Sequence, residues 1–231
     1  MATERFWHLP VLQMMINRGA MFVIRRFAKA LGVLMVAGVA WPVAASGALA
    51  QFETFVQTVS AARGTFNQYT VGPQGQTSQA QSGEFSFARP GQFRWDIKKP
   101  YAQEVVSDGK SLYQYDPDLQ QLTVRALDQS IGSSPAAILF GQGQLQDAFE
   151  VNALPDRDGM AWLRAVPRQP DAGLNQVDIG MREGRPVRLL LVDGFGQTTQ
   201  VDLLTLRAQS GFAAEEFTIV PPLGTDIVRV Q

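Results

Sequence analysis

The stretch Glu84-Phe-Ser-Phe-Ala-Arg-Pro-Gly-Gln-Phe-Arg-Trp95 carries the pattern that decides the fold. Large aromatic residues stand at every second position before Pro90-Gly91, and they do so again after it. Such alternation is typical of a half-buried strand, and Pro-Gly is a turn former. The stretch therefore predicts an antiparallel hairpin with one aromatic face and with Arg89 at its rim. That face carries Phe85, Phe87, Phe93 and Trp95.

The period-two pattern continues along most of the chain, with turn formers such as Asp108-Gly109 at hairpin distance. The candidate strands are Thr65–Val71, Ala80–Phe87, Phe93–Ile97, Gln103–Val106, Ser111–Tyr115, Gln121–Leu127, Val151–Leu154, Ala161–Val166, Gln176–Met181, Pro186–Val192, Thr198–Leu206 and Phe217–Val220. Many short strands joined by tight turns indicate a mainly β protein built on one large antiparallel sheet or barrel. No linker or repeat interrupts the pattern, so we expect one domain over residues 51–231.

Two stretches have helical patterns instead. Apolar residues at i, i+3, i+4 and i+7 predict a short helix near the start of this domain, and its apolar face carries Phe52, Phe55, Val56 and Val59. In the middle of the chain, Ser134 is a candidate N-cap and Pro135 suits the first helical position. Gln144–Glu150 is expected to add another turn. We expect this insert, Pro135–Glu150, to cover one face of the sheet.

Several strands are apolar on both faces, and Val187–Val192 is the plainest case. A curved sheet that packs against one helix has a single core to fill. Two interpretations follow: part of the concave face lines an apolar cavity beneath the insert, or the interior is a solid core without a ligand.

The first fifty residues have the pattern of an export signal. A basic segment, Arg25–Lys29, precedes the uncharged run Ala30–Trp41, and small residues that suit a signal peptidase follow at Ala45 and Ala50. A transmembrane anchor is the other interpretation, but it needs about 20 apolar residues, and this run is too short. We therefore expect a signal peptide that directs the chain through the general secretory route.

We place the cleavage after Ala50, so that residues 1–50 are removed, with cleavage after Ala45 as the alternative. Met21 heads a signal of ordinary length. We therefore expect residues 1–20 to come from an upstream start codon.

Composition excludes several classes of function. The chain has no cysteine, and its single histidine, His8, lies within the expected signal. These counts argue against disulfides, thiol chemistry, Ser–His hydrolases and the commonest metal ligands, so we expect no metal and no cofactor. Removing residues 1–50 takes away five of the 20 Lys and Arg residues and one of the 21 Asp and Glu residues, which leaves the rest acidic. An acidic chain is a poor match for nucleic acid or an anionic membrane surface.

The segments that match catalytic motifs lack the structural context that catalysis needs. Ser107-Asp-Gly-Lys110 matches the S-x-x-K pattern of penicillin-binding enzymes, but Asp-Gly predicts a hairpin turn there, where those enzymes need a helix. Glu215 and Glu216 are adjacent, and neighbouring residues of a strand point to opposite faces. We therefore expect no enzyme.

The segment from Arg89 to Trp95 resembles the R-P-x-x-F-x-W signature of the periplasmic outer-membrane lipoprotein carrier proteins, the LolA family. The resemblance continues in register over essentially the whole exported chain. The further segments that carry it are Gly64–Gln68, Ser107–Pro117, Gly132–Pro135 and Phe217–Pro222.

This resemblance implies an unclosed antiparallel β-barrel of about 11 strands with an N-terminal helix and a helical lid over an apolar cavity. It implies a monomeric periplasmic chaperone without stable membrane insertion, whose cavity holds the acyl chains of a lipoprotein. An inner-membrane ABC-type release complex would load it, and an outer-membrane lipoprotein receptor would unload it. Arg89 matches the family arginine that bonds to the lid backbone, and the corresponding lid positions are Ile138, Leu139 and Phe140. Together with Phe85, Phe87, Phe93 and Trp95, they are the expected cavity residues.

The lid departs from the expected pattern, with Ala136, Ala137 and Gly141 smaller and Phe140 larger. Two other functions remain open beside the carrier: transport of free phospholipid or another apolar small molecule, and a sensor domain of the same fold.

Overall fold

A computed structural model of the chain describes residues 47–127, 135–140, 145–169 and 173–230. These residues belong to one unit, which spans residues 44–231. Residues 1–46 of the predicted signal segment and the predicted N-cap residue, Ser134, lie outside the described residues.

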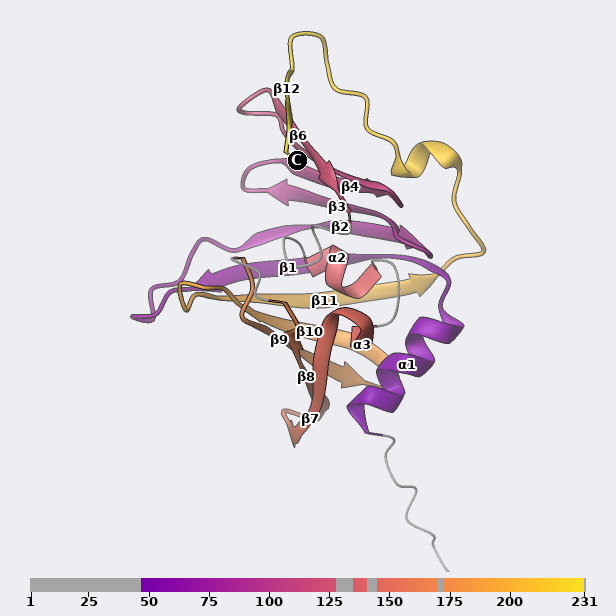
Figure 1. Cartoon of the computed structure of the whole chain (residues 1–231), viewed down its shortest axis with the longest axis vertical. Helices are drawn as coiled ribbons and strands as arrows, with labels where there is room; N and C mark the ends of the chain where they lie inside the picture. Colours follow the sequence, from indigo (N-terminus) through magenta and orange to yellow (C-terminus); the bar gives the residue numbers. More distant parts are fainter. Residues whose placement is uncertain (1–46, 128–134, 141–144, 170–172, 231) are drawn as a thin grey trace, which may run out of the picture. The chain divides into compact units, whose positions relative to one another are not determined.

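The described strands join into one twelve-stranded sheet, in the order β12-β6-β5-β4-β3-β2-β1-β11-β10-β9-β8-β7 (Figure 1). Their bounds are β1 (Ala61–Val71), β2 (Gln81–Ala88), β3 (Gln92–Lys99), β4 (Gln103–Asp108), β5 (Ser111–Asp116), β6 (Gln121–Ala126), β7 (Phe149–Arg157), β8 (Met160–Pro167), β9 (Gln176–Arg182), β10 (Arg185–Val192), β11 (Thr198–Ala208) and β12 (Asp226–Arg229). Neighbouring strands run antiparallel, except that β12 pairs with β6 in parallel. The order ends at β7 and β12, so the sheet is an unclosed barrel, as expected.

The predicted strands from Thr65–Val71 to Thr198–Leu206 are confirmed, with ends that shift by a few residues. The last one is wrong. Part of Phe217–Val220 belongs to a 3-10 turn, η2 (Ala214–Phe217), and the final strand is β12 instead. Local pattern misses β12 because all four of its residues are exposed, so they show no alternation between a buried and a solvated face.

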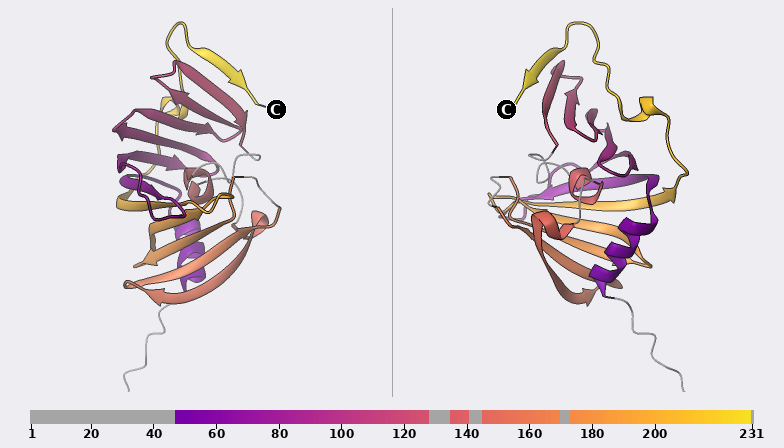
Figure 2. Two further views of the ribbon diagram at one scale, coloured as in Figure 1. Left: turned by 90° about the vertical axis from the view of Figure 1, so that its left-hand side faces the viewer. Right: turned by 45° about the vertical axis from the view of Figure 1, so that its right-hand side comes forward.

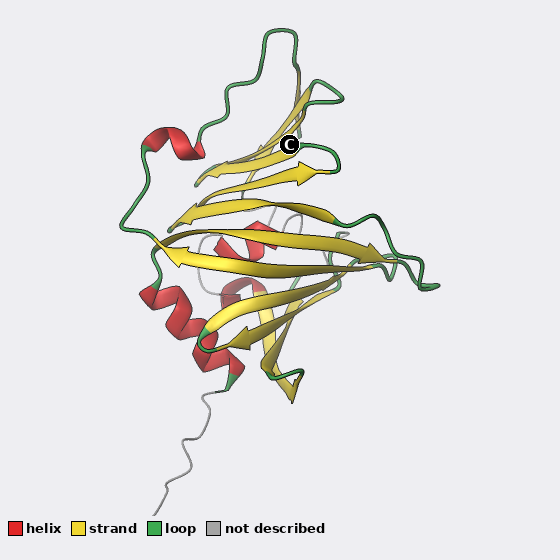
Figure 3. Ribbon diagram, turned by 180° about the vertical axis from the view of Figure 1, so that it is seen from behind, coloured by secondary structure: helices red, strands yellow, loops and turns green. Residues whose placement is uncertain are grey.

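Three helices lie against the sheet: α1 (Ala48–Thr58), α2 (Pro135–Phe140) and α3 (Leu145–Ala148). Figure 2 shows that the sheet is curved and that α2 lies within its concave side. In Figure 3, which views the molecule from the opposite side to Figure 1, the strands lie between the viewer and α2. The first helix buries Phe52 and Phe55 in the same core as the concave face of the sheet, as predicted. Within the insert Pro135–Glu150, the described residues form α2, α3 and the start of β7.

The chain after β11 crosses the opposite, convex face. Trp95 points into the core, so its neighbour Arg94 must point outward. Arg94 donates hydrogen bonds to the carbonyl oxygens of Glu216 (2.9 Å) and Thr218 (2.7 Å). We call residues 209–225 the C-terminal strap, because this segment runs outside the sheet from β11 to the far edge at β12 (Figure 1).

Among the described helices, none combines the length and the apolar character needed to cross a membrane.

Candidate functional site

The aromatic residues of the opening hairpin form the centre of the concave face. Paired strands place Phe85 opposite Trp95 and Phe87 opposite Phe93, and all four side chains are at most 2% exposed. Phe66 of β1 completes the cluster, with its ring stacked on Trp95 at 3.8 Å between centroids. Its place in the alternation of the predicted strand Thr65–Val71 is a signal that could have identified it as a core residue.

Helix α2, which we call the lid because it covers this face, inserts an aromatic side chain into this cluster. The Phe140 ring stacks on Phe87 at 4.1 Å between centroids and on Phe85 at 5.5 Å. Ile138 and Leu139 are also buried, as are both lid alanines, Ala136 and Ala137. A six-residue helix is too short to be stable alone, so contacts with the sheet must hold it in place.

Arg89 joins the lid to the rest of the molecule. Its Nη2 donates to the carbonyl oxygen of Leu139 (3.0 Å), and its Nε donates to that of Val59, just after α1 (3.3 Å). The last carbonyl groups of a helix lack partners within the helix, so Leu139 offers a free acceptor. The guanidinium also lies over the rings of Phe87 (5.1 Å) and Phe55 (5.7 Å). One side chain thus connects the end of β2 with the ends of α1 and α2.

The setting of Arg89 is unusual for a guanidinium. Burial lowers its pKa from the usual range of a guanidinium to about 10, because desolvation disfavours the charged form. It stays protonated at neutral pH, and contacts with ring faces and carbonyl oxygens compensate for lost water.

The space between the sheet and α2 is occupied by the side chains of the lid. A pocket of about 280 Å³ remains at the Pro135 end of α2, between the lid and strands β1, β3, β4 and β5. Small-molecule sites usually measure roughly 300–1,000 Å³, so this pocket is small for a long hydrocarbon chain unless the lid withdraws. A second pocket of about 320 Å³ lies on the convex face, and its lining residues include Glu216 of the strap and Arg63, Arg94 and Arg207.

The S-x-x-K segment forms a turn, as predicted. Ser107 Oγ donates to the carbonyl oxygen of Gly91 (2.8 Å) and accepts from the backbone N–H of Gly109 (3.1 Å). Asp108 caps the turn by accepting hydrogen bonds from the backbone N–H groups of Lys110 and Ser111, and these bonds help lower its pKa even though desolvation raises it. Glu215 and Glu216 lie in η2 and not in a strand.

The amino-acid sequence of the chain matches those of known proteins. The sequence model of one family, "Outer membrane lipoprotein carrier protein LolA", matches residues 57–220. An outer-membrane lipoprotein carrier protein of Bordetella pertussis is 57% identical over 211 residues, which cover 91% of this chain and all of that protein. One from Methylobacillus flagellatus is 38% identical and covers 82% of this chain and 92% of the relative.

Among solved structures, a LolA superfamily protein from Nitrosomonas europaea aligns with a TM-score of 0.48 and 12% identity, over 74% of this chain and 96% of that one. The family match covers most of the described sheet, and the relatives align over nearly their whole length. The chain therefore belongs to the family of outer-membrane lipoprotein carrier proteins, the LolA family.

Proposed function

We propose that this chain is a periplasmic chaperone that shields the acyl chains of outer-membrane-directed lipoproteins. In the empty form, α2 covers the aromatic face and Phe140 fills the space between its rings. In the loaded form, the lid withdraws and acyl chains take the place of Ile138, Leu139 and Phe140. The observation that carries the proposal is an apolar concave face covered by a short helix that one arginine holds.

We further propose an inner-membrane ABC-type complex as the loading partner and an outer-membrane receptor as the unloading partner. Burial of one CH₂ group contributes about 0.8 kcal/mol, so one ~16-carbon chain that is fully buried would contribute on the order of 11 kcal/mol. A tight fit would make release impractically slow in a compartment without ATP. A lid that competes with the cargo for the same aromatic face weakens the net binding and permits transfer.

Depletion in the native host, followed by membrane fractionation, tests the function. Lipoproteins destined for the outer membrane should accumulate in the inner membrane. Native mass spectrometry of the protein purified from the periplasm should show a co-purifying lipoprotein. Co-purification of free phospholipid alone, with normal lipoprotein localisation after depletion, would refute the carrier function.

The structure of α1 supports the alternative site of signal cleavage. Ala48 is 3% exposed within α1, and the carbonyl oxygen of Gly47 accepts a hydrogen bond from the N–H of Gln51 (3.1 Å). Cleavage after Ala50 would remove this first turn, whereas cleavage after Ala45 keeps it. We therefore propose Ser46 as the first residue of the exported protein, and the intact mass of periplasmic protein tests this.

A further inference from the structure

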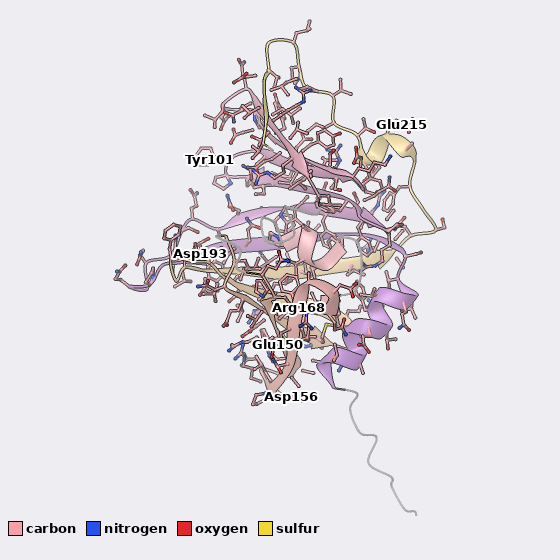
Figure 4. The ribbon with its side chains drawn as sticks, viewed as in Figure 1. Tyr101, Glu150, Asp156, Arg168, Asp193 and Glu215 are labelled. Carbon is pink, nitrogen blue, oxygen red and sulfur yellow. The ribbon has the colours of Figure 1, made fainter. Side chains whose placement is uncertain are left out.

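The concave face changes character along its strands. On β1 the inward positions run from Phe66 to Gln68, on β4 from Val105 to Gln103, and on β5 from Leu112 to Gln114. These three glutamines therefore lie at the same end of the sheet, away from α1 and Arg89. Figure 4 marks this end with Asp193, whose turn joins β10 to β11. We call Gln68, Gln103 and Gln114 the glutamine end of the concave face.

The glutamine end borders the 280 Å³ pocket beside Pro135. Its other walls are mainly apolar: Trp95, Ile97, Val105, Leu112, Leu174 and Leu191. Nε2 of Gln68 donates to Oε1 of Gln81 (2.6 Å), while Oε1 of Gln68 is buried and accepts no hydrogen bond. Within the described part of the chain, the amides of Gln103 and Gln114 form no side-chain hydrogen bond to another residue. The pocket thus offers unpaired amide donors and acceptors beside an apolar wall.

Such groups select for a ligand that is part hydrocarbon and part polar. A pure hydrocarbon chain at this end would displace water from the amides and leave them unpaired, which costs free energy. A carbonyl group at the same place would accept hydrogen bonds from the glutamine amides. Thr199 adds a hydroxyl group, which is paired with Thr70 at 3.0 Å between the two oxygens.

The charged residues that line the pocket indicate the charge of the ligand. Among its described lining residues there is no lysine, arginine or histidine. The one carboxylate, Asp193, is committed to its own turn, where Oδ1 accepts from the backbone N–H groups of Phe195 and Gln197, both at 2.9 Å. The pocket therefore matches a neutral carbonyl group better than a phosphate or another anion.

We propose that the glutamine end binds the ester carbonyl groups through which acyl chains join the glyceryl part of the cargo. The acyl tails then extend along the aromatic face toward Arg89, into the space that α2 vacates. This inference rests on the proposed carrier function and adds an orientation to it: the head of the lipid lies at Gln103 and Gln114, and the tails lie at the locked end of the lid.

The test compares two neutral probes with the full exported chain. One is dipalmitoylglycerol, and the other is its diether analogue, dihexadecylglycerol, which lacks both carbonyl groups. Each displaces a fluorescent apolar probe from the protein. The wild type should bind the ester about 3- to 10-fold more tightly than the ether, since one or two neutral hydrogen bonds contribute that much.

The double variant Gln103→Met and Gln114→Met should remove this preference while leaving affinity for the ether unchanged or higher. Methionine keeps the approximate volume and removes the hydrogen bonds. Gln200→Met is the matched control, because Gln200 precedes the inward Val201 on β11 and so points to the convex face. That control should retain the full preference.

Equal affinity of the wild type for ester and ether would overturn the inference and leave the carrier function intact. A double variant that weakens both probes equally would overturn it as well, because the glutamines would then act only through packing. Failure of the wild type to bind either probe would overturn the carrier function together with this inference.

Discussion

Two arginines five positions apart hold two different segments against opposite faces of one sheet. Arg89 holds the lid on the concave side through the carbonyl oxygen of Leu139, and Arg94 holds the C-terminal strap on the convex side through those of Glu216 and Thr218. Arg94 also has carboxylate partners, Glu104 at 2.7 Å and Asp96 at 3.5 Å. Arg89 relies on aromatic rings and backbone oxygens in a desolvated setting.

The difference suggests two kinds of attachment. The carboxylates of β3 and β4 hold the Arg94 guanidinium in place for its bonds to the strap, so the strap meets a preorganised anchor. The attachment of the lid by Arg89 is less stable, because burial of the guanidinium is costly and the lid helix is only six residues long. A contact of this kind can be broken when a ligand competes for the same space. The following predictions test whether the two arginines differ in this way.

The largest effect is expected from Arg89→Leu. Hydrogen bonds to a charged group contribute roughly 1.5–3 kcal/mol, so their loss should shift the closed-to-open ratio of the lid by about tenfold to a hundredfold. Loading should survive, while transfer to the outer-membrane receptor should slow. A two-step transfer assay with purified components measures both. Poor loading with normal unloading would show that Arg89 acts in uptake or partner docking instead.

Arg94→Leu should affect stability and leave the lid unchanged. Its side chain is 19% exposed and makes two hydrogen bonds to the strap, so we expect a loss of about 1–2 kcal/mol in the free energy of unfolding. Denaturant titration measures this loss. The affinity for a fluorescent apolar probe should stay within a factor of about two of the wild type. A strong rise in probe affinity would show that the strap also controls the cavity.

Arg89→Lys should be milder than Arg89→Leu. Lysine keeps the charge but lacks the planar fork that reaches Val59 and Leu139 together. We expect a shift of the lid equilibrium of about threefold to tenfold, measured in the same transfer assay. A lysine variant as impaired as the leucine variant would mean that the two-carbonyl geometry matters and the charge does not.

The smallest effect should come from pH. The folded-state pKa of Arg89 is about 10, below the ordinary range of a guanidinium, so the group is protonated in both folded and unfolded chains at lower pH. The contribution of Arg89 to the free energy of unfolding is therefore constant up to about pH 9. Above pH 10 the folded chain loses this proton before the unfolded chain does, and because it then no longer buries a charge, the contribution rises with pH. Probe affinity measured from pH 6 to pH 9 should be flat. A clear transition in this window would assign lid control to another titrating group.

Much of the fold follows from local pattern. Alternation of apolar and polar residues identifies the inward residues of the central strands, because each strand buries one of its two faces. The spacing of apolar residues at i, i+3 and i+4 identifies α1. The position of Arg89 at the rim follows from the turn, whereas its bond to the lid was implied only by family resemblance. Burial of Phe140 against Phe87 depends on how α2 crosses the sheet.

Long-range contacts account for what the sequence does not reveal. Arg94 meets the strap across a separation of 122 residues, and nothing beside Arg94 or Glu216 marks the pair. The glutamine end also depends on contacts between strands. Alternation places Gln103 and Gln114 on inward positions one at a time, but only the register of β4 with β5 brings them beside one pocket.

The unclosed sheet has a mechanical consequence. In a closed barrel, strand number and stagger together set the diameter, and a wider interior requires broken hydrogen bonds. Here the strand order ends at β7 on one side and β12 on the other, so the sheet can flatten or curl by small changes in strand twist while every ladder stays intact. Along β7, Glu150, Pro155 and Asp156 make that edge a poor template for a strand of another chain. The interior can thus adjust its width to cargo of different bulk while the β7 edge stays unsuited to pairing with another chain.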